Sequence, residues 1–165
     1  MKIAFNVLPL KSPHKDRGIG YYTQNLLEVL KQDQTLEIQE FTNISEVRRA
    51  DVIHYPWFDF FFHSLSLKRP SPTVVTVHDV IPLKFAEHYP VGFRGRLNFI
   101  LQKWALKSCK ILITDSQASQ KDIAKYLKIP AEKIEVIYLA ADAQFKILPD
   151  AKLLCQCIEF FSKLV

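Results

Sequence analysis

The sequence predicts an α/β fold: a Rossmann-like, doubly wound domain whose mainly parallel sheet carries helices on both faces. Short apolar segments rich in β-branched residues alternate along the chain with longer segments whose apolar residues recur at helical spacing. The segment 73–77 (TVVTV) is the clearest buried strand, because strands covered on both faces are nearly continuous runs of such residues. No internal repeat or linker divides the alternation, so we expect a single domain of this kind.

Several short segments have the apolar, β-branched character of strands. They cover residues 2–8, 36–41, 50–55, 73–77, 110–114 and 134–137. Pro56 ends the third of these segments, and Pro70 and Pro72 separate the fourth from an aromatic segment over 58–67.

Helices are predicted where apolar residues recur at intervals of three and four. The first covers residues 19–31 after a loop over 9–20, and either Asn43 or Ser45 caps a short second helix. A long loop over 82–91 then precedes a further helix. Its apolar stripe, of the kind that normally faces a core, comprises Phe93, Leu97, Ile100, Leu101, Trp104 and Ala105.

The last two helices of the chain are predicted from a serine N-cap and from the spacing of apolar residues. Ser116 or Ser119 caps a helix that ends near Leu127, before Pro130. Residues 148–165 form a helical tail of apolar residues at helical spacing.

The composition is that of a globular protein, with 48% hydrophobic and 24% charged residues among 165. No apolar run approaches the roughly 20 residues that span a bilayer, and the apolar start is too short for a signal peptide. We therefore expect a cytoplasmic protein. Cys109, Cys155 and Cys157 form neither a disulfide framework nor a complete zinc site, so we expect reduced thiols, and the sequence assigns no role to the last two.

The formal net charge of +5 favours anionic partners. Two interpretations remain open: a solvated basic face, and a peripheral contact with the inner face of a membrane. No zinc-finger spacing and no RNA-binding aromatic signature is present, so nucleic acid is not expected as a partner.

Polar residues and glycines follow four of the predicted strands. In open α/β sheets, ligands bind in the crevice beyond the carboxyl ends of the strands. We therefore expect Gly18 and Gly20, His54, His78 and Ser116 to lie along one edge of the sheet.

Each of these positions also has a structural interpretation. The two glycines either let a phosphate approach a helix N-terminus or simply turn the chain. His54 either bonds a ligand or supports the strand end, and Ser116 caps a helix whether or not it also faces the crevice.

His78 and Asp79 are neighbours in the sequence. Neighbouring side chains of an extended chain point in opposite directions. We therefore expect one of the two to face the crevice and the other to hold the loop, rather than a simple dyad.

Five segments of the chain resemble glycosyltransferase family 4. They are residues 17–27 (RGIGYYTQNLL), 50–54 (ADVIH), 75–82 (VTVHDVIP), 113–123 (ITDSQASQKDI) and 129–138 (IPAEKIEVIY), and they come in the family's order. The last continues into Ala140-Ala141-Asp142, where the family often has glycine at the first position. The resemblance covers roughly residues 1–146.

The resemblance implies a GT-B fold, in which two Rossmann-like domains face a cleft. It implies a retaining, metal-independent hexosyltransferase without a cofactor, whose substrates are a nucleotide-sugar donor and a hydroxyl acceptor. His78 matches the family's active-site histidine, which is expected to contact the transferred sugar. Gly18 and Gly20 would approach the donor diphosphate and the acceptor.

Three further positions complete the site that the resemblance implies. Ser116 lies where the family has a residue near the cleft, and Asp79 is a further substrate-binding candidate beside His78. Tyr21 is a substrate-binding candidate that stands where many members have arginine.

By this resemblance residues 1–147 form the acceptor-side N-terminal domain, and 148–165 form a tail that the family does not explain. The donor-binding C-terminal domain, with its E-x7-E motif, is absent, so we expect a fragment or a natural truncation that is inactive alone. Phe58, Phe60, Phe61 and Phe62 either face the missing domain, contact a membrane or fill the core.

Two rival hypotheses stay open at this point. One is a non-catalytic binding subunit or truncated remnant that pairs with a separate donor domain or a membrane surface. The other is a flavodoxin-like nucleotide or signalling domain, although no acidic cluster follows the first strand to make a phospho-acceptor site.

Overall fold

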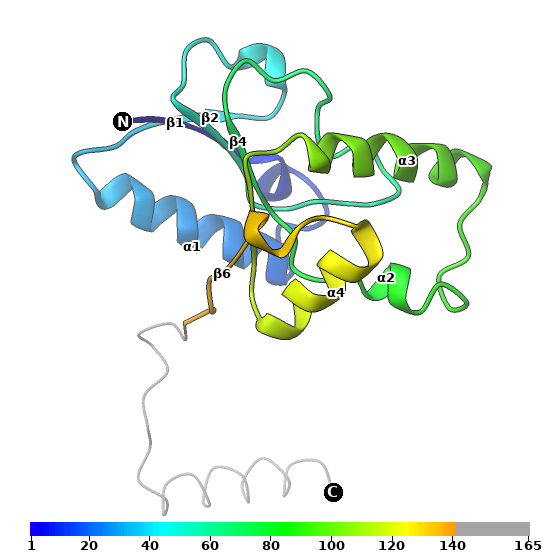
Figure 1. The fold of residues 1–165 in the computed structure, drawn as a ribbon. Helices are drawn as coiled ribbons and strands as arrows, with labels where there is room; N and C mark the ends of the chain where they lie inside the picture. Colours follow the sequence, from blue (N-terminus) through cyan, green and yellow to red (C-terminus); the bar gives the residue numbers. More distant parts are fainter. Residues whose placement is uncertain (141–165) are drawn as a thin grey trace, which may run out of the picture.

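A six-stranded parallel sheet forms the centre of the computed structural model, which describes residues 1–140 (Figure 1). The strand order is β2-β1-β3-β4-β5-β6, and every neighbouring pair is parallel. β2 pairs only with β1 among these strands, and β1 pairs with β3 on its other side. The predicted Rossmann-like parallel sheet is confirmed. The predicted tail over 148–165, with Cys155 and Cys157, lies outside the described residues.

Each strand falls inside its predicted segment. The bounds are β1 Lys2–Asn6, β2 Glu37–Phe41, β3 Val52–Tyr55, β4 Thr73–Thr76, β5 Ile111–Thr114 and β6 Ile134–Val136. The central strands β3 and β4 are largely buried, and β4 (TVVT) accordingly reads as a continuous β-branched run rather than an alternating pattern.

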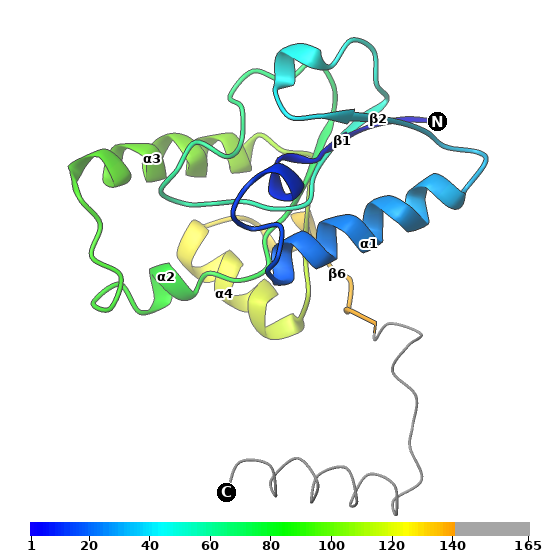
Figure 2. The same cartoon turned by 180° about the vertical axis from the view of Figure 1, so that it is seen from behind.

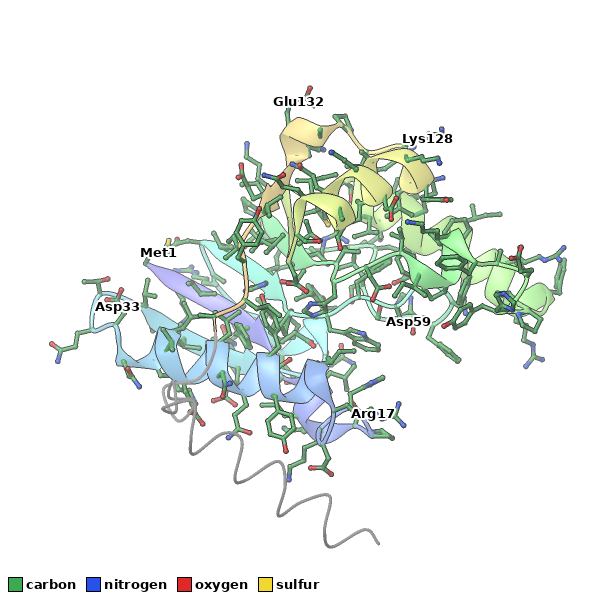
Figure 3. All side chains as sticks on the ribbon, turned by 90° about the horizontal axis from the view of Figure 1, so that it is seen from below. Met1, Arg17, Asp33, Asp59, Lys128 and Glu132 are labelled. Atoms are coloured by element: carbon green, nitrogen blue, oxygen red, sulfur yellow. The ribbon has the colours of Figure 1, made fainter. Side chains whose placement is uncertain are left out.

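Helices cover both faces of the sheet. They are α1 Gly18–Gln32, α2 Ile81–Lys84, α3 Phe93–Lys107 and α4 Gln117–Leu127, with 3-10 helices η1 Leu8–Lys11, η2 Ile44–Glu46 and η3 Ala131–Lys133. Figure 3 shows α1 on one side of the sheet and α4 on the other. The smaller apolar cluster, which contains Phe5, Val7 and Leu27, lies on the α1 side, and the larger one lies on the α3 and α4 side.

Local hydrogen bonds explain where several elements begin. Asn43 rather than Ser45 caps η2, in a reciprocal arrangement with Glu46, and Ser116 rather than Ser119 caps α4. Two predicted loops are partly helical: 9–20 includes most of η1 and the first residues of α1, and 82–91 starts within α2.

The apolar stripe of α3 does not face the core, which corrects the usual expectation for such a stripe. Its members are exposed: Phe93 76%, Leu97 48%, Ile100 63%, Leu101 46% and Trp104 63%, and only Ala105 is buried. The buried face of α3 consists of Gln102, Ala105 and Leu106. The helix therefore carries apolar side chains on two opposite faces.

The aromatic segment after β3 mostly fills the core. Phe58 and Phe60 are buried, whereas Phe62 is exposed. Gln102 of α3 holds the end of this segment, because its Oε1 accepts from the amide of Leu65 at 2.9 Å and its Nε2 donates to the Leu65 carbonyl at 3.0 Å.

Candidate functional site

His78 lies just beyond the carboxyl end of β4, between the ends of two neighbouring strands. Its Nδ1 is 2.7 Å from Oδ2 of Asp115, which directly follows β5. Its Nε2 is 3.2 Å from the carbonyl oxygen of Pro56, which directly follows β3. About a fifth of each of the two side chains stays accessible, 20% for His78 and 21% for Asp115. The ring is therefore fixed by the fold but still reachable from outside.

Both ring nitrogens of His78 face oxygen atoms that can only accept hydrogen bonds, a carboxylate and a carbonyl. A neutral imidazole has one N–H, so it satisfies one of these acceptors, and a doubly protonated ring satisfies both. The second carboxylate oxygen of Asp115, Oδ1, is buried and has no hydrogen-bond partner among the described residues. The His78 ring is therefore the one side-chain partner of this carboxylate among the described contacts, and it bonds Oδ2 alone.

A hydrogen-bonded chain supports the His78 ring from the side of α1. The Tyr22 ring meets the His78 ring edge to face, with centroids 4.8 Å apart. The Tyr22 hydroxyl is 3.2 Å from Oγ1 of Thr76, and that same oxygen is 3.1 Å from Nε2 of His54. Burial raises the pKa of the Tyr22 phenol, so the group stays protonated and able to donate. These contacts tie α1, β3 and β4 together directly behind His78.

His54 belongs to this support and not to an accessible surface. His54 is only 8% exposed, and its ring packs edge to face on the Phe5 ring. Burial lowers the pKa of His54 from 6.5 to about 4, so the ring is neutral near pH 7. The prediction that His54 binds substrate is corrected, because its ring lies inside the core and bonds Thr76.

The two glycines at the start of α1 differ in their surroundings. A Cβ on Gly18 would meet no atom within 4 Å, so this position is open. A Cβ on Gly20 would lie 2.0 Å from the carbonyl oxygen of Lys15 and 2.5 Å from that of His14. Gly20 is thus required by the close approach of the chain's own loop, and only Gly18 keeps the backbone open to a ligand.

The remaining predicted residues have local roles that the structure defines. Tyr21 is 62% exposed, and Tyr22 is the tyrosine that contacts His78. Asp79 is exposed and accepts from the amide of Ile81 at 2.8 Å, so its side chain holds the loop just before α2. Ser116 caps α4 by accepting from the amide of Ser119 at 3.1 Å.

Sequence reasoning missed the partners of His78. Asp115, Thr76 and the Pro56 carbonyl follow or end a strand, whereas Tyr22 lies on α1, and the sequence alone does not say which of them meet. The signal was present for Asp115, because it follows a buried strand next to a chosen residue, Ser116.

A hollow of the surface lies away from this edge. It lies at the opposite edge of the sheet, near the start of β4 and β5, and it is lined by Arg69, Lys110 and Lys133 among others. It is remote from His78. Within residues 1–140 no group of three or more histidine, cysteine or acidic side chains is arranged to hold a metal ion.

Residues 16–145 match the sequence profile described as Glycosyltransferase Family 4, and this is most of the chain. The chain belongs to glycosyltransferase family 4. This membership removes the flavodoxin-like alternative.

A curated relative agrees with the family. Over 77 residues the chain is 36% identical to the O-antigen chain mannosyltransferase RfbU of Salmonella typhimurium. The alignment covers 46% of this chain and 20% of that protein. The family-4 chain thus aligns with about a fifth of its curated relative's length.

Proposed function

We propose that this family-4 domain binds the acceptor of a retaining, metal-independent hexosyltransferase. The enzyme would move a sugar from a nucleotide-sugar donor to a hydroxyl of a glycan, a lipid or a small molecule. The single observation that supports this most is the position of His78, held between the ends of β3 and β5 with part of its ring open. This edge also borders the reversal in strand order at β1, and ligands bind at such points in open α/β sheets.

In this proposal His78 holds a sugar hydroxyl. Asp115 accepts the Nδ1 hydrogen and fixes the ring plane, which leaves Nε2, 3.2 Å from the Pro56 carbonyl oxygen, as the nitrogen that bonds the substrate hydroxyl. The enzyme holds the acceptor hydroxyl in line with the anomeric carbon of the donor sugar. This positioning replaces a random encounter of the two substrates and accounts for a large part of the rate enhancement. The acceptor oxygen then bonds the anomeric carbon as the bond to the diphosphate oxygen breaks, and the acceptor proton passes to the leaving diphosphate.

The start of α1 is our candidate for contact with the diphosphate. The first amides of a helix have no partner inside the helix, and the helix dipole favours negative charge there. The open position of Gly18 lets an anion approach these amides, with Arg17 exposed beside it. Figure 3 shows Arg17 and Asp59 toward the same end of the molecule, whereas Met1 and Asp33 lie at the other.

The whole enzyme's activity needs a second domain in this proposal. A C-terminal domain with the family's E-x7-E motif would bind most of the donor, and the domain described here would transfer sugar poorly without it. Because the similar protein RfbU is a mannosyltransferase, a mannosyl donor should be among the donors tested.

The test compares the chain alone with the chain supplied with a C-terminal donor domain. UDP- and GDP-sugars, GDP-mannose among them, are offered with glycan, lipid and small-molecule acceptors. We expect turnover only with the donor domain, and its loss in the variant His78→Ala. The matched control is His88→Ala, because the His88 side chain is 73% exposed on a loop.

Two results would count against this proposal. Robust transfer by the isolated chain contradicts the division of labour, and equal rates for His78→Ala and the wild type contradict the role of His78. Acceptor binding without transfer, even with a donor domain, would favour a non-catalytic binding subunit.

A further inference from the structure

Helix α3 presents an apolar surface to the outside of the molecule. We call it the outward face of α3; it consists of Phe93, Leu97, Ile100, Leu101 and Trp104, all of them exposed. At 3.6 residues per turn these five lie on one side of the helix, opposite the buried Gln102 and Leu106. Figures 1 and 2 show α3 along the periphery of the domain, away from α1. Five neighbouring exposed apolar side chains are more than a monomer's surface ordinarily carries, and such patches mark interaction sites.

Cations flank this face. Arg96, Lys103 and Lys107 lie along one side of the stripe and Arg94 lies along the other, and Phe93–Lys107 contains no acidic residue. Burial, with the nearby charges of Lys107 and Lys128, lowers the pKa of Lys103, which reflects how closely positive groups gather here. The chain as a whole carries a formal net charge of +5.

We propose that the outward face of α3 rests on a lipid bilayer with anionic headgroups. An apolar stripe with tryptophan and phenylalanine, bordered by lysine and arginine, is the pattern of a helix that lies in the membrane interface. The stripe enters the boundary between headgroups and acyl chains, and the flanking cations meet the headgroups. A protein partner would need an apolar groove of matching shape with acidic groups around it. An anionic bilayer supplies an apolar layer and negative headgroups without any such matching shape. Within residues 1–140 no helix is long and apolar enough to cross a membrane.

The inference does not depend on the chemistry at His78, and vesicle binding tests it directly. The purified chain is sedimented with vesicles of phosphatidylcholine alone and with vesicles that also contain phosphatidylglycerol. We expect binding to the anionic vesicles, and weaker binding at high salt because exposed charges are screened. The double variant Arg96→Gln/Lys107→Gln should bind more weakly than the wild type.

A matched pair of variants separates the outward face of α3 from general surface hydrophobicity. Ile100 is 63% exposed, and Val29 is 62% exposed on α1, across the sheet. Ile100→Glu should lower the partition coefficient by about tenfold or more, because a charge enters the interface poorly. Val29→Glu should change it by less than about twofold. Both variants should keep the thermal unfolding midpoint of the wild type, since both positions are exposed.

Fluorescence of Trp104 tests which occupant covers the face. The chain has two tryptophans, so Trp57→Phe leaves Trp104 as the reporter. We expect solvent-exposed emission without vesicles and a shift to shorter wavelength when anionic vesicles are added. Emission already shielded without vesicles would overturn the proposal in favour of a second copy or another segment of the chain. Absence of vesicle binding, or equal losses for Ile100→Glu and Val29→Glu, would also overturn it.

Discussion

Nδ1 of His78 lies 2.7 Å from Oδ2 of Asp115, although the two residues are 37 positions apart in the chain. The acidic neighbour in sequence, Asp79, turns instead to the amide of Ile81. The His78–Asp115 pair therefore depends on the register of β4 against β5, in which Thr76 lies beside Ile113. Under the proposed function, the residue that bonds the substrate and the residue that positions it follow two different strands.

Asp115→Asn should reduce sugar transfer by the chain with its donor domain, by roughly 100-fold in kcat and with little change in KM. The amide removes the negative charge that orients the His78 ring, and small displacements of a catalytic group have effects of this size. The measurement is steady-state kinetics, together with ¹⁵N chemical shifts of the His78 ring, which report where its protons reside.

Asp79→Asn is the matched control for Asp115→Asn. It keeps an oxygen that can accept from the Ile81 amide, so the loop and kcat should both be preserved. Unchanged His78 ring shifts in Asp115→Asn would contradict the positioning role.

Gly20→Ala should destabilise the fold, whereas Gly18→Ala should not. The new Cβ at position 20 would meet backbone carbonyl oxygens, which cannot move aside as a side chain can, and we expect a cost of roughly 1–3 kcal/mol. Gly18→Ala adds a better helix former in open space and should be neutral or stabilising by up to about 1 kcal/mol. Urea unfolding of the two variants measures both values. Equal unfolding midpoints for Gly18→Ala and Gly20→Ala would show that the backbone at residues 14 and 15 moves aside to make room for the new Cβ.

The stability of the wild type should fall in mild acid because of His54. The pKa of His54 is about 4 in the folded state, against the ordinary histidine value of 6.5 in the unfolded chain, so the unfolded chain binds the proton first as the pH drops. The free energy of unfolding should therefore decrease through the window from about pH 6.5 down to about pH 4. Between pH 7 and pH 5 this amounts to about 2 kcal/mol.

His54→Gln isolates that contribution. The glutamine amide can still bond Thr76 but does not titrate, so the variant should lose less stability than the wild type over the same pH range. Denaturant unfolding at several pH values gives the comparison. Parallel curves for the two proteins would mean that His54 is not the group responsible.

Gln102→Leu should cost roughly 2–4 kcal/mol, although leucine is more apolar. The substitution leaves the buried amide and carbonyl of Leu65 without their partners, and each orphaned group carries a desolvation penalty. Thermal or urea unfolding measures the loss, with Lys107→Gln on the same helix as a control at an exposed position. Equal unfolding midpoints for Gln102→Leu and the wild type would show that the backbone groups of Leu65 find other hydrogen-bond partners.

The strands could be predicted from the sequence because their signal is local. β-branched runs such as 73–77 favour a strand, and the alternation with helices implies a parallel sheet. The orientation of α3 could not be predicted in this way. It has apolar residues on two faces, and only the packing of the whole domain decides that Ala105 and Leu106 turn inward with the polar Gln102.

The sequence could place His78 beyond the end of a strand, but it could not say which groups surround its ring. Its contact with a substrate stays a prediction. The choice between Tyr21 and Tyr22, and between Asp79 and Asp115, depends on helix phase and on which strands become neighbours. His54 was misjudged because burial of its ring is a property of the packed core.

β1 is an interior strand, second from one edge of the sheet, so the first residues of the chain hold other elements in place. β2 bonds only to β1 among the described strands, and β3 bonds to it from the other side. A protease or a late start of translation that removes residues 1–7 would detach α1 and β2 together and uncover an unpaired strand edge. Such a product would be prone to aggregate, although it has lost only a few residues.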